Sequence, residues 1–244
     1  MIINTFNPAW FIMFGVQVVL IVLIALLFGK KPPREKERFF TGFYLFSVIF
    51  LIGYKVYLVH FSTTYETFWA NELPLNLCQV ASLLAYPAVK RNLPGLKAFC
   101  FFIGSLCSLM GLLMPVTGFY NIPLLSGDSI GFYGFHGLVF VQSISLVTLR
   151  LCRPQFRDIP KVLIYIAGIA LLVHCCNLLL RATGLNEISN YFFTCDPENN
   201  PILGFLYRMI PVGYVYLLPI LLPLYPVLCF IAFLVRKAQG PEAA

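Results

Sequence analysis

Charged residues are scarce in this chain. Only 11% of its 244 residues are Asp, Glu, Lys or Arg, against about 25% in an average soluble domain. Hydrophobic residues make up 59% of the chain, and the mean hydropathy is +0.84. So few charges cannot cover the surface of a soluble protein of this size. These figures exclude a soluble enzyme and predict a polytopic membrane protein.

The chain also has no long polar segment in which a separate extramembrane domain could fold. The formal net charge is +7, but the basic residues form short clusters between apolar stretches and no continuous basic face. We therefore expect no nucleic-acid partner, because nucleic-acid binding requires such a face. The chain length suffices for seven spans of about 20 residues with short connections. We predict an all-α fold with a single seven-helix transmembrane domain over residues 1–244.

Seven apolar segments are candidates for these spans. The first segment is followed by a charged linker and by no A-x-A-like cleavage site, which favours a retained helix over a signal peptide, the alternative. The expected spans are Pro8 to Phe28, Phe39 to Val59, Leu73 to Val89, Ala98 to Met114, Gly131 to Leu149, Val162 to Leu180, and Ile210 to Val235.

The distribution of Lys and Arg predicts the orientation of the spans. Basic residues cluster in the linkers after the first, third and fifth segments and again in the C-terminal tail. The connections on the other side carry only Arg181 and Arg208. Because Lys and Arg are retained in the cytoplasm, we expect an outer N-terminus and a cytoplasmic C-terminus. We further expect a multi-pass protein of a bacterial plasma membrane.

Polar side chains within spans are costly in a bilayer, so they are candidate functional residues. At 1.5 Å per residue, those of the central segments lie about 5–9 Å below the outer boundary. The polar residues of each segment share one helix face. We therefore predict one shallow outer pocket, lined by Lys55, Asn76, Cys78, Gln79, Tyr133, His136, His174, Asn177 and Arg208.

Each of these residues also has a structural interpretation. A histidine in a span often links two helices by a hydrogen bond, Lys55 can extend to the membrane surface, and a buried cysteine behaves as a small apolar residue. Cys195 follows the sixth segment without an evident partner, so no disulfide is expected. No HxxxH or CxxC spacing is present, which argues against a metal site. We expect no cofactor.

Three short motifs resemble a known family. Leu73-Pro74-Leu75-Asn76-Leu77-Cys78 resembles the Leu-Pro-Leu-His-Leu-Cys signature of the YwaF membrane proteins, to whose family the animal transmembrane protein 164 belongs. Phe132-Tyr133-Gly134-Phe135-His136 is similar to the aromatic entry of a later helix in that family. Asn190-Tyr191-Phe192-Phe193 is similar to its Asn-Tyr-aromatic segment before the last span. The resemblance extends from about the third segment to the end of the chain.

The resemblance implies a seven-span fold. For the animal member, it implies acyl transfer onto phospholipid with the motif cysteine as the acyl-carrying nucleophile. Carried over, Cys78 would be the nucleophile and His136 its base, while Tyr191 would join the substrate-binding residues. Asn76 stands where the family motif has a histidine.

We weigh three functions. The first is lipid-directed acyl transfer or hydrolysis, in which Cys78 attacks an ester, His136 moves the proton, and Asn76 or Gln79 hydrogen-bonds the oxyanion. Its ligand is a membrane phospholipid or an acyl chain. The second is transport or binding of a small solute in the same pocket. The third is a non-catalytic receptor or assembly factor in which the polar residues only specify packing.

Overall fold

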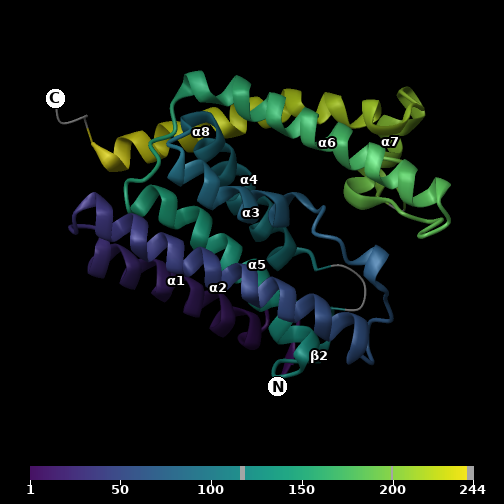
Figure 1. The fold of residues 1–244 in the computed structure, drawn as a ribbon, viewed down its shortest axis with the longest axis horizontal. Coiled ribbons are helices and arrows are strands. Elements are labelled where there is room, and N and C mark those ends of the chain that lie inside the picture. The colour runs from purple at the N-terminus through teal and green to yellow at the C-terminus, as the bar shows by residue number, and fades with distance from the viewer. Residues whose placement is uncertain (116–118, 199, 241–244) are drawn as a thin grey trace. The chain divides into compact units, whose positions relative to one another are not determined.

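The computed structural model describes residues 1–115, 119–198 and 200–240 of the chain. These residues divide into two compact units, each of which is described by itself. Unit 1 comprises Met1–Glu72 and Leu77–Arg153, and unit 2 comprises Leu73–Asn76 and Pro154–Ala244. Figure 1 shows the helices and strands of both units along the chain.

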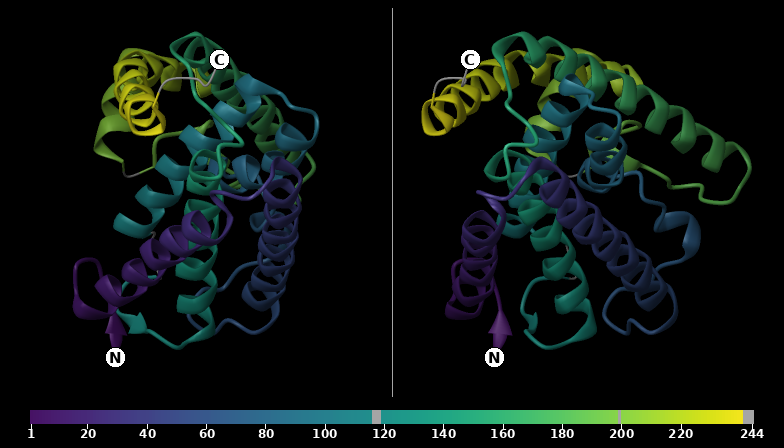
Figure 2. Two further views of the ribbon diagram at one scale, coloured as in Figure 1. Left: turned by 90° about the vertical axis from the view of Figure 1, so that its left-hand side faces the viewer. Right: turned by 60° about the vertical axis from the view of Figure 1, so that its left-hand side comes forward.

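Unit 1 consists of five α-helices, a short 3₁₀ helix and a two-stranded ribbon within its described residues. Strand β1 pairs antiparallel with β2, so that Ile2 lies opposite Pro123. Helix α5 packs against each of the other four helices, and α1 and α2 lie on either side of it (Figure 2). The elements are β1 (Ile2–Ile3), α1 (Pro8–Phe28), α2 (Pro33–His60), η1 (Trp69–Asn71), α3 (Leu77–Lys90), α4 (Pro94–Leu113), β2 (Ile122–Pro123) and α5 (Gly127–Thr148).

Unit 2 is built around the helices α6 and α8, which pack beside each other (Figure 1). A short 3₁₀ helix, η2, precedes α6 in the chain. Two further 3₁₀ helices, η3 and η4, and the nine-residue helix α7 connect α6 to α8. The elements are η2 (Phe156–Asp158), α6 (Ile159–Ala182), η3 (Tyr191–Phe193), α7 (Pro201–Met209), η4 (Gly213–Ile220) and α8 (Leu221–Gln239).

Local sequence signals explain where several helices begin. Proline occupies the first turn of α1, α2, α4, α6 and α7, where its missing N–H has no helical acceptor in any case. The side chain of Asn7 caps α1 by accepting a hydrogen bond from the backbone of Trp10, and Ser126 caps α5 in the same way. Such caps satisfy amide groups that the first turn leaves unpaired.

Six helical segments of the described chain are long and apolar enough to cross a membrane. They are Pro8–Phe28, Pro33–His60, Pro94–Leu113, Gly127–Thr148, Phe156–Ala182 and Gly213–Gln239. The prediction of an all-α polytopic membrane protein is confirmed by these helices. The last of the six joins η4 to α8, so the predicted final span begins as a 3₁₀ helix.

The predicted third span is wrong at its start. Residues Leu73 to Asn76 precede the helix, and α3 begins at Leu77. The proline at position 74 disfavours helical geometry in Leu73, the residue before it, so the helix does not extend back to the predicted start. With 14 residues, α3 is only about 21 Å long, and it is not among the six membrane-length segments.

Candidate functional site

Cys78 and His136 are brought together in unit 1. The Sγ atom of Cys78 lies 3.9 Å from Nε2 of His136. Cys78 lies in the first turn of α3, and His136 lies on α5. The opposite ring nitrogen, Nδ1, lies 2.8 Å from the carbonyl oxygen of Phe132, one turn earlier in α5. A proton on Nδ1 donates to that carbonyl, which leaves the lone pair of Nε2 directed at the thiol.

One turn after Cys78 along α3, a second polar contact joins α3 to α5. The hydroxyl of Ser82 donates to Oε1 of Gln142 at 2.7 Å, and Nε2 of Gln142 donates back to the carbonyl oxygen of Ser82 at 3.3 Å. Ser82 lies four residues after Cys78, so both occupy one face of α3. This reciprocal contact fixes the register that places the thiol beside the imidazole.

A glycine on a third helix makes room for the imidazole. A Cβ atom at Gly111 of α4 would lie 2.4 Å from Cδ2 and 2.6 Å from Nε2 of His136. These distances are well inside van der Waals contact, so only a glycine fits here while the ring keeps its position.

Helix α5 begins one turn earlier than predicted. We expected α5 to begin at Gly131, but its first residue is Gly127, after the Ser126 cap. His136 therefore lies about 14 Å along the helix axis from its start. Ser126 follows the apolar residues Pro123, Leu124 and Leu125 and lies in the predicted connection before the helix.

The remaining predicted residues of unit 1 differ in their surroundings. Gln79 is buried next to Cys78 in the chain, and its Oε1 has no hydrogen-bond partner in the described structure. Lys55 is also buried, and its ammonium is paired with the Glu72 carboxylate at 2.5 Å. Tyr133 is buried, and its hydroxyl donates to the carbonyl oxygen of Phe119 at 3.0 Å. Of these side chains, Gln79 alone presents an unpaired polar atom.

Glu72 is a partner of Lys55 that the sequence reasoning missed. Its second carboxylate oxygen accepts a hydrogen bond from Thr67 at 2.9 Å, so both oxygens are paired. A buried ion pair needs such additional hydrogen bonds to offset its desolvation. The charge of Lys55 is therefore already neutralised by Glu72, and any binding of substrate by Lys55 would involve the ion pair and not a free ammonium.

Unit 1 also contains an apolar cavity of about 420 Å³ between α1, α2 and α5. Tyr133 lines it, whereas Cys78 and His136 do not. The buried side chain of Gln17 also lines the cavity, and its Oε1 is unpaired within the described residues. This cavity is thus separate from the thiol–imidazole pair.

The predicted residues of unit 2 form a second group. Asn177 is fully buried on α6 and uses its whole amide: Oδ1 accepts from Ser189 and from the backbone of Tyr191, and Nδ2 donates to the Tyr191 carbonyl and to Thr194. Tyr191 is buried, and its hydroxyl accepts a hydrogen bond from the backbone of Leu73 at 2.9 Å. These contacts fix the segment between α6 and α7 in place.

His174, one turn before Asn177, has a partner that the sequence did not reveal. Its Nδ1 lies 3.9 Å from Sγ of Cys195. Cys195 is a half-buried free thiol. Burial raises the pKa of the Cys195 thiol above its usual value, and the nearby Arg181 guanidinium opposes this rise. The spacing of polar residues on α6 indicates which helix face His174 occupies. It does not indicate that the segment after the helix folds back and brings Cys195 to that face.

Two predicted residues lie outside both groups. Asn76 is exposed and precedes α3, so it does not share the helix face of Cys78 that we predicted. Arg208 is exposed on the short helix α7, which ends before the final membrane-length segment. The single pocket that unites all the predicted residues stays a prediction.

No group of three His, Cys, Asp or Glu side chains that could hold a metal occurs among the described residues.

The family comparison covers nearly the whole chain. The model of the TMEM164 family matches residues 5–235, which include both thiol–imidazole pairs. Searches of curated proteins and of solved structures found no match.

Proposed function

The chain belongs to the TMEM164 family, and from this premise we propose that it is a multi-pass membrane acyltransferase with Cys78 as nucleophile and His136 as base. The observation that supports this most is the 3.9 Å approach of the Cys78 thiol to Nε2 of His136. The substrate class is the acyl ester of a membrane phospholipid.

The first half of the reaction forms an acyl-enzyme. Nε2 of His136 accepts the proton of the Cys78 thiol, and the sulfur attacks the ester carbonyl carbon. When the tetrahedral intermediate collapses, the carbon–oxygen bond of the ester breaks, and the leaving alcohol takes the proton from Nε2. The products are an acyl thioester on Cys78 and a lysolipid. Throughout, the Phe132 carbonyl keeps the proton of Nδ1 in place.

The second half transfers the acyl group. Nε2 of His136 accepts the proton of the incoming hydroxyl, and the hydroxyl oxygen attacks the thioester carbonyl carbon. The carbon–sulfur bond then breaks, and Nε2 returns the proton to Sγ of Cys78. With an alcohol the reaction is transfer, and with water it is hydrolysis. Amide N–H groups in the first turn of a helix have no helical acceptor, so those of α3 around Cys78 are suited to bind the oxyanion. The unpaired Oε1 atom of Gln79 can accept a hydrogen bond from a hydroxyl or amine of the substrate.

We also propose seven spans with an outer N-terminus and a cytoplasmic C-terminus, α3 being the short additional segment. A segment of 14 residues does not cross a hydrocarbon core of about 30 Å by itself, so the irregular residues that precede it complete the crossing. The bias of Lys and Arg toward one side supports this orientation. Reporter fusions at the ends of the helices, in bacterial inner membranes, test it: a reporter after Arg38 active on the outer side would overturn it.

The direct test follows an acyl label through the purified protein. Incubation with a phospholipid that carries a tagged acyl chain should give a hydroxylamine-sensitive adduct on Cys78 and a tagged transfer product. Cys78→Ala should reduce transfer by about 10³-fold or more, and His136→Gln by about 10²-fold or more. Cys107→Ser is the matched control, since Cys107 packs in the same apolar cluster as Cys78.

Equal transfer by Cys78→Ala and the parent protein would refute the mechanism. Saturable binding of a small solute, without any covalent adduct and unchanged by Cys78→Ser, would instead establish the transport alternative.

A further inference from the structure

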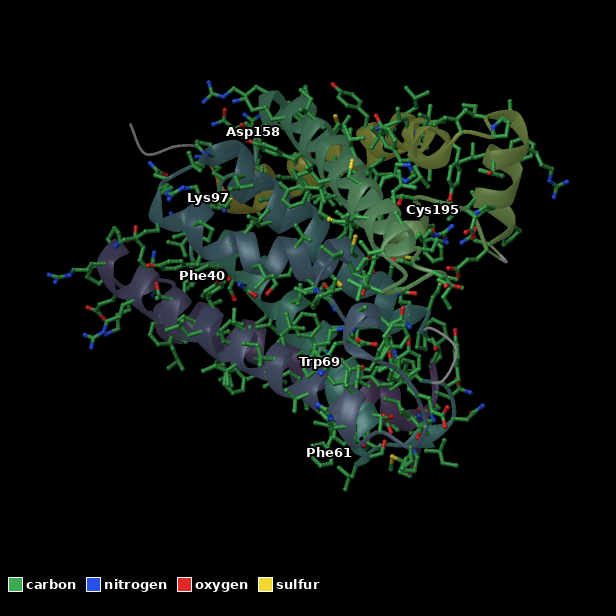
Figure 3. The ribbon with its side chains drawn as sticks, turned by 45° about the vertical axis from the view of Figure 1, so that its right-hand side comes forward. Phe40, Phe61, Trp69, Lys97, Asp158 and Cys195 are labelled. Atoms are coloured by element: carbon green, nitrogen blue, oxygen red, sulfur yellow. The ribbon has the colours of Figure 1, made fainter. Side chains whose placement is uncertain are left out.

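In unit 2, a second thiol lies against an imidazole, and neither residue takes part in the proposed reaction. Cys195 is half-buried in the segment after η3, where Figure 3 labels it. Its Sγ atom lies 3.9 Å from Nδ1 of His174. A thiol in contact with a base and accessible from solvent has the components of an activated nucleophile.

The protein fixes the thiol in this place by many contacts. The backbone amide of Cys195 donates to Oδ1 of Asn190 at 3.0 Å. The Nδ2 group of Asn190 donates in turn to Asp196, and Asp196 pairs with Arg181 at 3.3 Å. The hydroxyl of Tyr216 donates to the carbonyl oxygen of Phe193. The position of Cys195 is therefore set by several elements of unit 2 and does not depend on the local chain alone.

The backbone before Cys195 adopts an unfavourable conformation to reach this position. Phe192 and Phe193 have φ values of 58° and 53°, in the left-handed region that costs bulky residues about 1–3 kcal/mol each. Such strain persists only where the surroundings impose it. Here the buried Asn177 amide imposes it through hydrogen bonds to Tyr191 and Thr194, on either side of the two phenylalanines.

The imidazole is fixed as well. A Cβ atom at Gly213 would lie 2.8 Å from Cε1 and 2.9 Å from Nε2 of His174, so the backbone of η4 packs directly on the ring. The ring centre of Tyr214 lies 5.9 Å away. The thiol and the base are thus held by different segments that meet at one point of unit 2.

We propose that Cys195 is a second acyl-accepting thiol, with His174 as its base. Nδ1 of His174 accepts the thiol proton, and Sγ bonds to the carbonyl carbon of an acyl ester or acyl thioester. The bond from that carbon to its oxygen or sulfur breaks, and the leaving alcohol or thiol takes the proton from His174. The product is an S-acyl thioester on Cys195. The acyl class of the substrate rests on the proposed function of the chain.

Two probes separate the sources of the acyl group. The protein in nanodiscs is incubated with an alkyne-tagged long-chain acyl thioester in one arm and with a phospholipid bearing an alkyne-tagged acyl chain in the other. Label that hydroxylamine removes is then mapped to individual cysteines by mass spectrometry. We expect label on Cys195 in at least one arm, which identifies the donor. Absence of label on Cys195 in both arms overturns the proposal.

Variants distinguish a thiol that His174 activates from one that reacts only because it is accessible. His174→Gln should slow labelling of Cys195 at least tenfold. Gly213→Ala, which keeps the histidine but displaces its ring, should also slow it, so a folding defect in one variant does not decide the outcome. Cys175, exposed on α6, is the internal control. If Cys195 labels no faster than Cys175, or if neither variant slows it, Cys195 is an ordinary thiol and the proposal fails.

The Cys78→Ser variant separates this inference from the proposed function. Loss of transfer in that variant concerns Cys78 alone, whereas label on Cys195 should persist there. If Cys195 labelling disappears in Cys78→Ser, the acyl group reaches Cys195 only by way of Cys78, and direct acceptance is refuted.

Discussion

Gly111 offers a way to test the first thiol–imidazole pair without removing either member. In Gly111→Ala, the new Cβ would lie 2.4 Å from Cδ2 of His136. Carbon atoms in contact are about 3.5–4.0 Å apart, so the ring has to move by roughly 1 Å. Such a movement lengthens either the 3.9 Å contact with Cys78 or the 2.8 Å hydrogen bond to Phe132.

A displacement of this size has a calculable effect on the proposed reaction. A misplacement of about 1 Å in a catalytic group costs up to about 10²-fold in rate. We therefore expect Gly111→Ala to lower kcat for acyl transfer by about 100-fold with little change in KM for the lipid. Replacing glycine by alanine inside a helix otherwise adds about 0.5–1 kcal/mol of stability, which partly offsets the steric strain. The fall in rate should therefore exceed any fall in Tm.

The assay is acyl transfer by the purified variant in nanodiscs, with its Tm measured on the same sample. Gly53→Ala on α2 is the matched control, because a Cβ there meets nothing within 4 Å. Its rate should equal that of the parent. If Gly111→Ala also keeps the rate of the parent while remaining folded, the position of the His136 ring does not matter to the reaction, and the proposed base is wrong.

Three further predictions follow from buried or paired groups. Glu72→Gln leaves the buried Lys55 ammonium without its counter-ion and should lower the free energy of unfolding by about 3–5 kcal/mol, whereas replacing both residues by apolar ones should restore most of it in a denaturation assay. Asn177→Ala removes four hydrogen bonds of one buried amide and should cost about 3 kcal/mol or more, because it leaves buried partners unpaired; an unchanged Tm would contradict this. Burial raises the pKa of the Cys195 thiol, Arg181 lowers it and Asp196 raises it, so alkylation of Cys195 should accelerate as the pH rises. Arg181→Gln should then slow alkylation at a fixed pH, and a faster reaction would show that the charge of Arg181 does not stabilise this thiolate.

The helices were predictable because their signal is local. Long apolar runs, the asparagine cap of α1 and the prolines in first turns each depend on a few neighbouring residues. The prediction for the third segment was wrong for the same reason: its apolar composition extends back to Leu73, but Pro74 disfavours helical geometry there, and α3 begins at Leu77. Composition alone does not distinguish an apolar helix from an apolar extended segment.

The pairing of Cys78 with His136 was predictable in part. Helical spacing placed each on a polar face, and the family motifs named both residues. The role of Phe132 follows from the same helix, because its carbonyl lies one turn before His136. Gly111 could not be found in this way, since its function appears only when α4 packs against α5.

Side chains whose partners come from loops were not predictable. The sequence gives Lys55 as a lone cation in an apolar helix, yet Glu72 reaches it from the connection before α3. Cys195 likewise has no partner in the linear sequence and meets His174 only because two phenylalanines adopt left-handed backbone angles. Both contacts depend on irregular backbone, for which hydrophobic periodicity carries no information.

The two thiol–imidazole pairs are held in place by different kinds of structure. We therefore expect them to respond differently to the same mutation. In the first pair, both members lie on regular helices, and the His136 ring is oriented by a carbonyl of its own helix. In the second, His174 is helical, but Cys195 is held by a loop whose shape depends on the Asn177 amide. Loss of that amide should therefore release Cys195 from His174 and slow its acylation, while the acyl-enzyme at Cys78 continues to form. An equal loss at both cysteines would contradict this expectation and would mean that the disturbance reaches Cys78 through the hydrogen bond from the Leu73 amide to the Tyr191 hydroxyl.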